Sequence, residues 1–108
     1  MSLPDEKNVG AALRYLTDTD ESYGRMVAKV KALEYEVKTI RALVLLDASG
    51  TVAEKEAQAC SSGPYRAFIE DYQNAVADKE ITQAKRKTHE LVIDVWRSCN
   101  ANMRKGNI

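Results

Sequence analysis

Apolar residues recur at alternating spacings of three and four along about six turns of helix in the first half of the chain. The positions are Tyr23, Met26, Val30, Leu33, Val37, Ile40 and Val44. This spacing places every member on one narrow face of a helix, and a second helix is what covers such a face. The pattern extends back through Leu16, Ala12 and Val9, with Thr19 as a polar interruption. The sequence therefore predicts a long helix that packs along another helix.

Turn signals divide the chain into three predicted helices. Ser49 and Gly50 end the first arm, which we expect over residues 4–48. Thr51 and Glu54 have the spacing of a capping box, and a short connector helix is expected over residues 51–60. Ser61 to Pro64 form the next turn, and the absence of Gly and further Pro up to Arg104 predicts a second arm over residues 64–104. With a short connector, the arms fold back on each other.

The predicted fold class is all-α. It is a long antiparallel helical hairpin, coiled-coil-like, with a short connector helix at the bend and a single domain over residues 1–108. On the second arm we expect a shift of phase near Lys79 in the face that contacts the first arm. The residues expected on that face are Tyr65, Ile69, Tyr72 and Val76, followed by Ile81, Ala84, Thr88, Leu91, Val95 and Cys99.

The composition and the scarcity of reactive residues argue against an enzyme or a metalloprotein. Charged residues make up 30% and aromatic residues 6% of the chain, which is typical of helical bundles rather than of deep ligand pockets. Cys60, Cys99 and His89 lack the spacing of metal ligands, and no nucleophile has an evident base. We therefore expect no catalytic residues, no metal and no cofactor.

The chain also lacks the signals of a membrane protein. No apolar run approaches the ~18 residues of a membrane span, and the N-terminus has no apolar stretch typical of a signal peptide. We therefore expect a cytoplasmic protein without a membrane partner.

A cluster of cations suggests one candidate binding site. Lys85, Arg86 and Lys87 are consecutive, and in an antiparallel hairpin they would lie level with Arg25 and Lys29 of the first arm. Such a strip could bind a phosphate backbone without reading sequence, which makes nucleic acid a candidate partner. The alternative is a solvated face of mixed charge, because nearby carboxylates can pair with these cations.

A second candidate site lies near the C-terminus. Apolar side chains lie on more than one helix face here, more than a single neighbouring helix can cover: Leu91, Val92, Ile93, Val95 and Trp96. The candidate contact residues are Leu91, Val92, Val95, Trp96 and the adjacent Arg97. We expect these residues to mediate self-association, giving a homo-oligomer, or to contact another partner. The alternative is that Trp96 packs within the hairpin itself.

The stretch from Glu34 to Arg104, two-thirds of the chain, resembles small helical proteins encoded by tailed bacteriophages and prophages. The features that carry the resemblance are the central segment SGTVAEKEA, residues 49–57, and the Trp96-Arg97 pair near the end of the second arm, which is followed by Asn and Arg residues. The resemblance implies a non-enzymatic accessory protein of the bacterial host cell that acts on DNA replication or recombination intermediates. Two alternatives stay open: an adaptor that binds a phage or host protein, and a virion assembly or scaffolding component.

Overall fold

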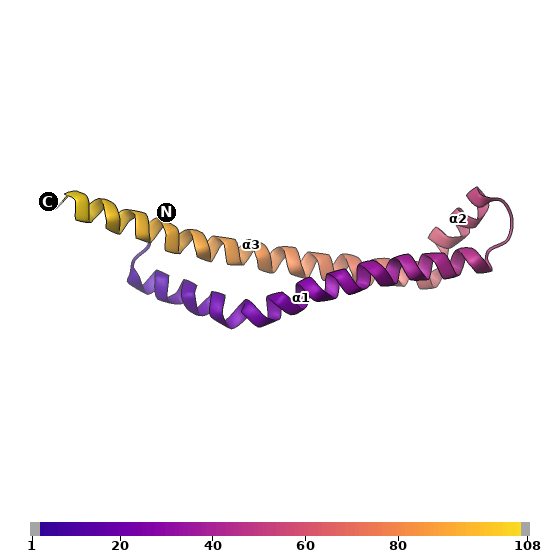
Figure 1. Cartoon of the computed structure of the whole chain (residues 1–108), viewed down its shortest axis with the longest axis horizontal. Coiled ribbons are helices and arrows are strands. Elements are labelled where there is room, and N and C mark those ends of the chain that lie inside the picture. Colours follow the sequence, from indigo (N-terminus) through magenta and orange to yellow (C-terminus); the bar gives the residue numbers. More distant parts are fainter. Residues whose placement is uncertain (1–2, 107–108) are drawn as a thin grey trace. The chain divides into compact units, whose positions relative to one another are not determined.

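The computed structural model describes residues 3–106 and consists of helices joined by short connections. The helices follow one another as α1 (Glu6–Asp47), α2 (Val52–Ser61) and α3 (Gly63–Gly106) (Figure 1). The two long helices run antiparallel, with the short α2 between them in the chain. This arrangement confirms the predicted all-α helical hairpin with a connector helix.

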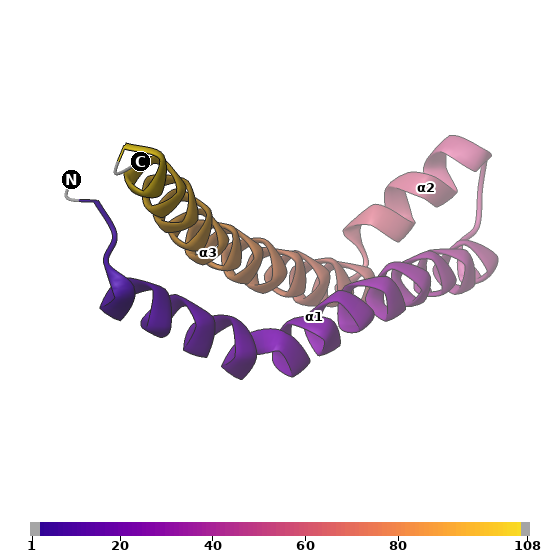
Figure 2. The same cartoon turned by 60° about the vertical axis from the view of Figure 1, so that its left-hand side comes forward.

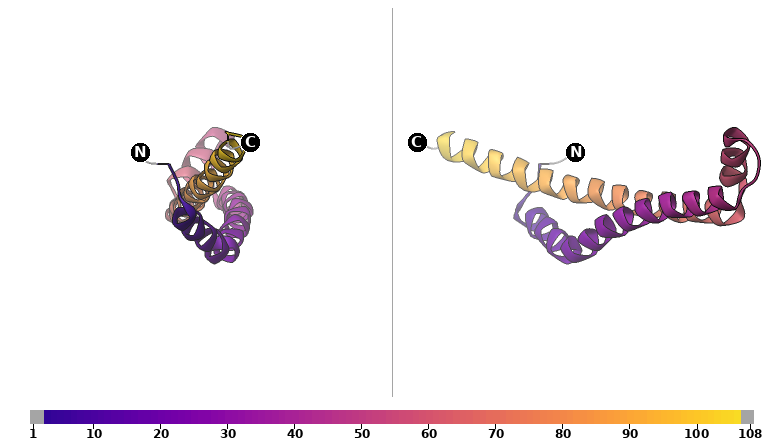
Figure 3. Two further views of the ribbon diagram at one scale, coloured as in Figure 1. Left: turned by 90° about the vertical axis from the view of Figure 1, so that its left-hand side faces the viewer. Right: turned by 45° about the vertical axis from the view of Figure 1, so that its right-hand side comes forward.

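Packing divides the chain into two compact units, and the division falls inside both long helices. The terminal unit comprises the described parts of Met1–Gly24 and Glu80–Ile108, and the bend unit comprises Arg25–Lys79. In the terminal unit the start of α1 lies beside the second half of α3 (Figure 3). In the bend unit the rest of α1 lies beside the first half of α3, and α2 connects them (Figure 2).

The predicted apolar face of α1 is confirmed. Its seven members from Tyr23 to Val44 are all buried or half-buried, and Val30 is 8% exposed. The earlier positions Val9, Ala12 and Leu16 are covered as well. Helix α1 also continues without a break through its polar stretch at Thr17–Glu21, where the Thr19 hydroxyl donates to the carbonyl oxygen of Tyr15 at 2.7 Å. A hydroxyl bonded in this way is satisfied inside a helix, although such bonds slightly destabilise helices and often bend them.

Local interactions in the bend unit hold α2 in place. The Thr51 hydroxyl accepts from the Glu54 amide at 3.2 Å, as the predicted N-cap requires. Gly50 has a φ of 110°, and a Cβ there would collide with the Glu54 carboxylate. Glycine is therefore the residue that this turn needs. Arg41 of α1 pairs with Glu56 of α2 at 3.1 Å.

The predicted inward face of α3 is wrong in the terminal unit. Ile81, Leu91 and Val95, which were expected to contact α1, are 54%, 61% and 41% exposed. Gln83, Arg86, His89, Ile93 and Trp96 are among the half-buried positions, and of the residues predicted there only Cys99 is half-buried. Together with the half-buried Val76 and Lys79, these positions follow one another at intervals of three or four residues. The covered face of α3 therefore continues past Lys79 without the predicted shift of phase. The prediction failed because polar side chains occupy inward positions that an apolar pattern cannot reveal.

Candidate functional site

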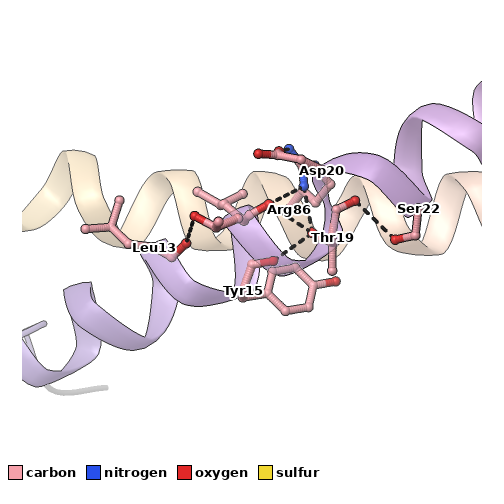
Figure 4. Close-up of polar contacts among 8 residues, drawn as sticks. Leu13, Tyr15, Thr19, Asp20, Ser22 and Arg86 are labelled. Atoms are coloured by element: carbon pink, nitrogen blue, oxygen red, sulfur yellow. Dashed lines mark hydrogen bonds and ion pairs between the residues drawn. The ribbon is translucent and has the colours of Figure 1, made fainter.

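The central polar contact of the terminal unit is made by the Arg86 side chain of α3. Its Nη1 donates to the Leu16 carbonyl oxygen at 3.0 Å and to the Thr19 hydroxyl at 2.6 Å, and its Nη2 pairs with the Asp20 carboxylate (Figure 4). The guanidinium also lies over the Tyr23 ring, 5.2 Å from the ring centre. All four partners belong to α1, so Arg86 joins the two helices.

The exposures of the two charged groups show which contacts matter most. The Arg86 side chain is 15% exposed, whereas that of Asp20 is 64% exposed. An ion pair with one partner mostly in water contributes little, whereas hydrogen bonds from a covered guanidinium to a carbonyl and a hydroxyl are protected from solvent. We infer that Leu16 and Thr19 hold Arg86 more firmly than Asp20 does.

A second inward polar residue, His89, lies one turn further along α3. Its ring stacks on the Tyr15 ring of α1, with centres 4.1 Å apart and planes 16° apart. Its Nδ1 lies 2.7 Å from the Lys85 carbonyl oxygen. Since a carbonyl only accepts, Nδ1 carries the proton and donates it. The ring therefore packs between the helices, and neither its partners nor its geometry suggest a catalytic base.

The predicted phosphate-binding residues differ in their exposure and in their contacts with α1. The Arg86 side chain points toward α1 and donates a hydrogen bond to it, whereas the neighbouring Lys85 and Lys87 are exposed. Arg25 and Lys29 are exposed residues of the bend unit. Phosphate binding by the five predicted residues stays a prediction, and within this set the Arg86 guanidinium is already hydrogen-bonded to α1.

The predicted association residues divide into two groups. Leu91, Val92 and Val95 line an open groove of ≈ 620 Å³ between α1 and α3 in the terminal unit. Trp96 is half-buried at an inward position, and Arg97 is exposed. This placement of Trp96 agrees with the alternative that it packs within the hairpin.

Short side chains on α1 explain why this groove is open. The α1 side of the groove presents Asn8, Ala11 and Ala12, which are too small to cover Leu91 and Val95. Both apolar side chains consequently remain in contact with water. Exposed apolar groups gathered along one helix mark a surface that another molecule can cover.

A set of exposed, uncharged residues of α3 also has a regular spacing. Ile81, Ala84, Thr88, Leu91, Val95 and Ser98 are all exposed and alternate at intervals of three and four. We call this set the outward stripe. Its first five members are residues that the sequence suggested for the inner face, so for these five the periodicity was found correctly but assigned to the wrong face. The sixth residue of the predicted series, Cys99, is half-buried instead. The outward stripe lies wholly within the terminal unit.

A further apolar patch occurs in the bend unit. Leu46 and Val52 are 80% and 78% exposed, and together with Lys55 and Glu56 they line a hollow between α1 and α2. Because α2 has 10 residues, this patch offers no long periodic face to a partner helix. The outward stripe is therefore the better developed candidate.

Comparisons with known proteins give no independent guide to this surface. Scans against protein-family models, curated proteins and solved structures find no match. The resemblance to phage proteins therefore stays a prediction. Within residues 3–106, no three potential metal-ligating side chains gather into one site. No helix of that described part has the length and apolar character needed to cross a membrane.

We predict that Arg86→Ala lowers the free energy of unfolding by about 1.5–3 kcal/mol, because it removes two solvent-protected hydrogen bonds from a charged donor. Asp20→Ala should cost less than about 1 kcal/mol, since its carboxylate is mostly in water. Urea unfolding at one protein concentration measures both, and Lys85→Ala is the matched control on the exposed face. A stability of Arg86→Ala equal to that of the parent would contradict this assignment.

Proposed function

We propose that the chain is a non-enzymatic interaction protein whose outward stripe binds a helix of a partner protein. The observation that supports this is the alternation of three and four over six exposed positions from Ile81 to Ser98. A helix surface with this repeat is complementary to another helix with the same repeat, which inserts its side chains between the exposed ones.

The chemistry of the stripe favours a protein over nucleic acid. All six of its residues are uncharged, whereas nucleic-acid affinity derives mainly from Lys and Arg contacts with phosphates. The cation at the centre of the predicted strip, Arg86, is bound to α1. A partner that covers Leu91 and Val95 gains apolar burial, which a phosphate backbone does not offer.

The adaptor and virion-assembly hypotheses are both compatible with this proposal, because each requires contacts between proteins. The DNA hypothesis from the phage resemblance is the second candidate. The observation in its favour is the exposure of Lys85 and Lys87 on α3. The two candidates use different residues, so they can be tested separately.

A photo-crosslinking amino acid in place of Leu91 tests the interaction proposal. We expect it to form a discrete adduct with a protein in cells that express the chain, because this position would lie inside the interface. Mass spectrometry should map the adduct to a partner segment with apolar spacing of three and four. The matched control replaces Leu13, which is 52% exposed in the same unit and does not line the groove. Equal adduct yields at both positions, or none at Leu91, would refute the proposal.

The variant Lys85→Gln/Lys87→Gln tests the DNA hypothesis while preserving Arg86. If these lysines bind phosphates, the slope of log affinity against log salt should flatten by about 0.7–0.9 for each phosphate that is no longer neutralised. The interaction proposal instead predicts that the double variant and the parent behave alike toward single- and double-stranded oligonucleotides. Fluorescence anisotropy over a salt series distinguishes these results.

A further inference from the structure

We propose that the helix that covers the outward stripe is α3 of a second copy of this chain, packed antiparallel to the first. This inference rests on the proposed function and names its partner. It follows from three properties of the terminal unit: the limited burial inside one copy, the sizes of the stripe residues, and the signs of the charges beside them.

One copy buries very little of its own apolar surface. Across the described residues, the buried side chains are Ala12, Val30, Ala59 and Ala75, and none of the larger ones is fully buried. A small chain with so thin a core commonly gains the burial that it lacks by association. The stripe supplies such surface, since Leu91 and Ile81 are more than half exposed.

The stripe is complementary to itself when it is reversed. With a two-fold axis between Thr88 and Leu91, each layer of the paired helices contains one large and one small side chain. The pairs are Ile81 with Ser98, Val95 with Ala84, and Leu91 with Thr88, each occurring twice. A parallel pair would instead oppose equal residues, with Ala84 against Ala84 and Leu91 against Leu91. Layers that each combine one large and one small side chain fill space better than layers that alternate between two small and two large ones. The side-chain sizes therefore favour the antiparallel pair.

The charges beside the stripe select the same alignment. Lys87 and Asp94 are exposed and lie seven residues apart, hence on the same edge of the stripe. In the antiparallel pair just described, Lys87 of each copy lies beside Asp94 of the other. Sliding one copy by seven residues in either direction places Lys87 against Lys87 or Asp94 against Asp94. Like charges opposite each other are unfavourable, so the alternative alignments are disfavoured.

Charge exchange tests this pairing directly. Both residues are exposed, so the variants should fold. Lys87→Asp and Asp94→Lys should each raise the dimer Kd by roughly tenfold, since two attractive contacts become repulsive. The double variant Lys87→Asp/Asp94→Lys should return to the parent Kd. An equimolar mixture of the two single variants should associate more tightly than either alone, because two carboxylates then face two ammonium groups.

Sedimentation equilibrium at micromolar concentration provides the measurement. The parent should show twice the chain mass of 12.0 kDa, and Leu91→Gln should weaken association more than either charge variant. A parent that stays at the mass of one chain would overturn self-association. A double variant or a mixture that fails to recover association would overturn this alignment.

The proposed function and this inference can fail separately. A monomeric parent whose position 91 crosslinks to another protein would refute the second copy as the partner and leave the interaction proposal standing. A monomeric parent without any adduct at that position would refute both.

Discussion

The hydrogen bonds of Arg86 with α1 determine which face of α3 is available to a partner. Its guanidinium reaches Leu16 and Thr19 and lies over Tyr23, so this side of α3 must face inward in the terminal unit. A guanidinium removed from water needs these acceptors, and rotating α3 to bury the outward stripe would leave it without them. The polar contact thus keeps Leu91 exposed, although apolar burial alone would favour covering it.

The sequence predicted the helices and the packing face of α1 because their signals are local. Periodic apolar residues from Tyr23 to Val44, together with Thr51 at a cap and Gly50 in a turn, suffice for those features. The inward face of α3 could not be found in the same way. Arg86 and His89 become inward residues only through Thr19 and Tyr15, which are more than 60 positions away in the chain. A polar residue that finds such partners is indistinguishable in sequence from a solvated one.

The contrast between local signals and contacts between distant residues also explains which parts of the candidate sites the sequence predicted. The sequence identified Leu91 and Val95 as residues in excess of what one neighbouring helix can cover, and the structure places them in an open groove. It could not reveal that the groove is open because Ala11 and Ala12 are small, since that depends on which residues of α1 lie opposite. It also grouped Arg86 with two exposed lysines, because adjacent positions of a helix differ in direction by about 100° and the sequence alone did not fix the inward one.

In the terminal unit α3 faces α1 through polar and aromatic contacts, which leaves the outward stripe exposed. Nuclear Overhauser measurements on the isotopically labelled chain test this most directly. The account predicts cross-peaks between the Tyr15 and His89 rings, whose centres are 4.1 Å apart, and between the Tyr23 ring and the Arg86 side chain. The absence of both, together with cross-peaks from the Leu91 methyl groups to those of Leu16, would contradict it.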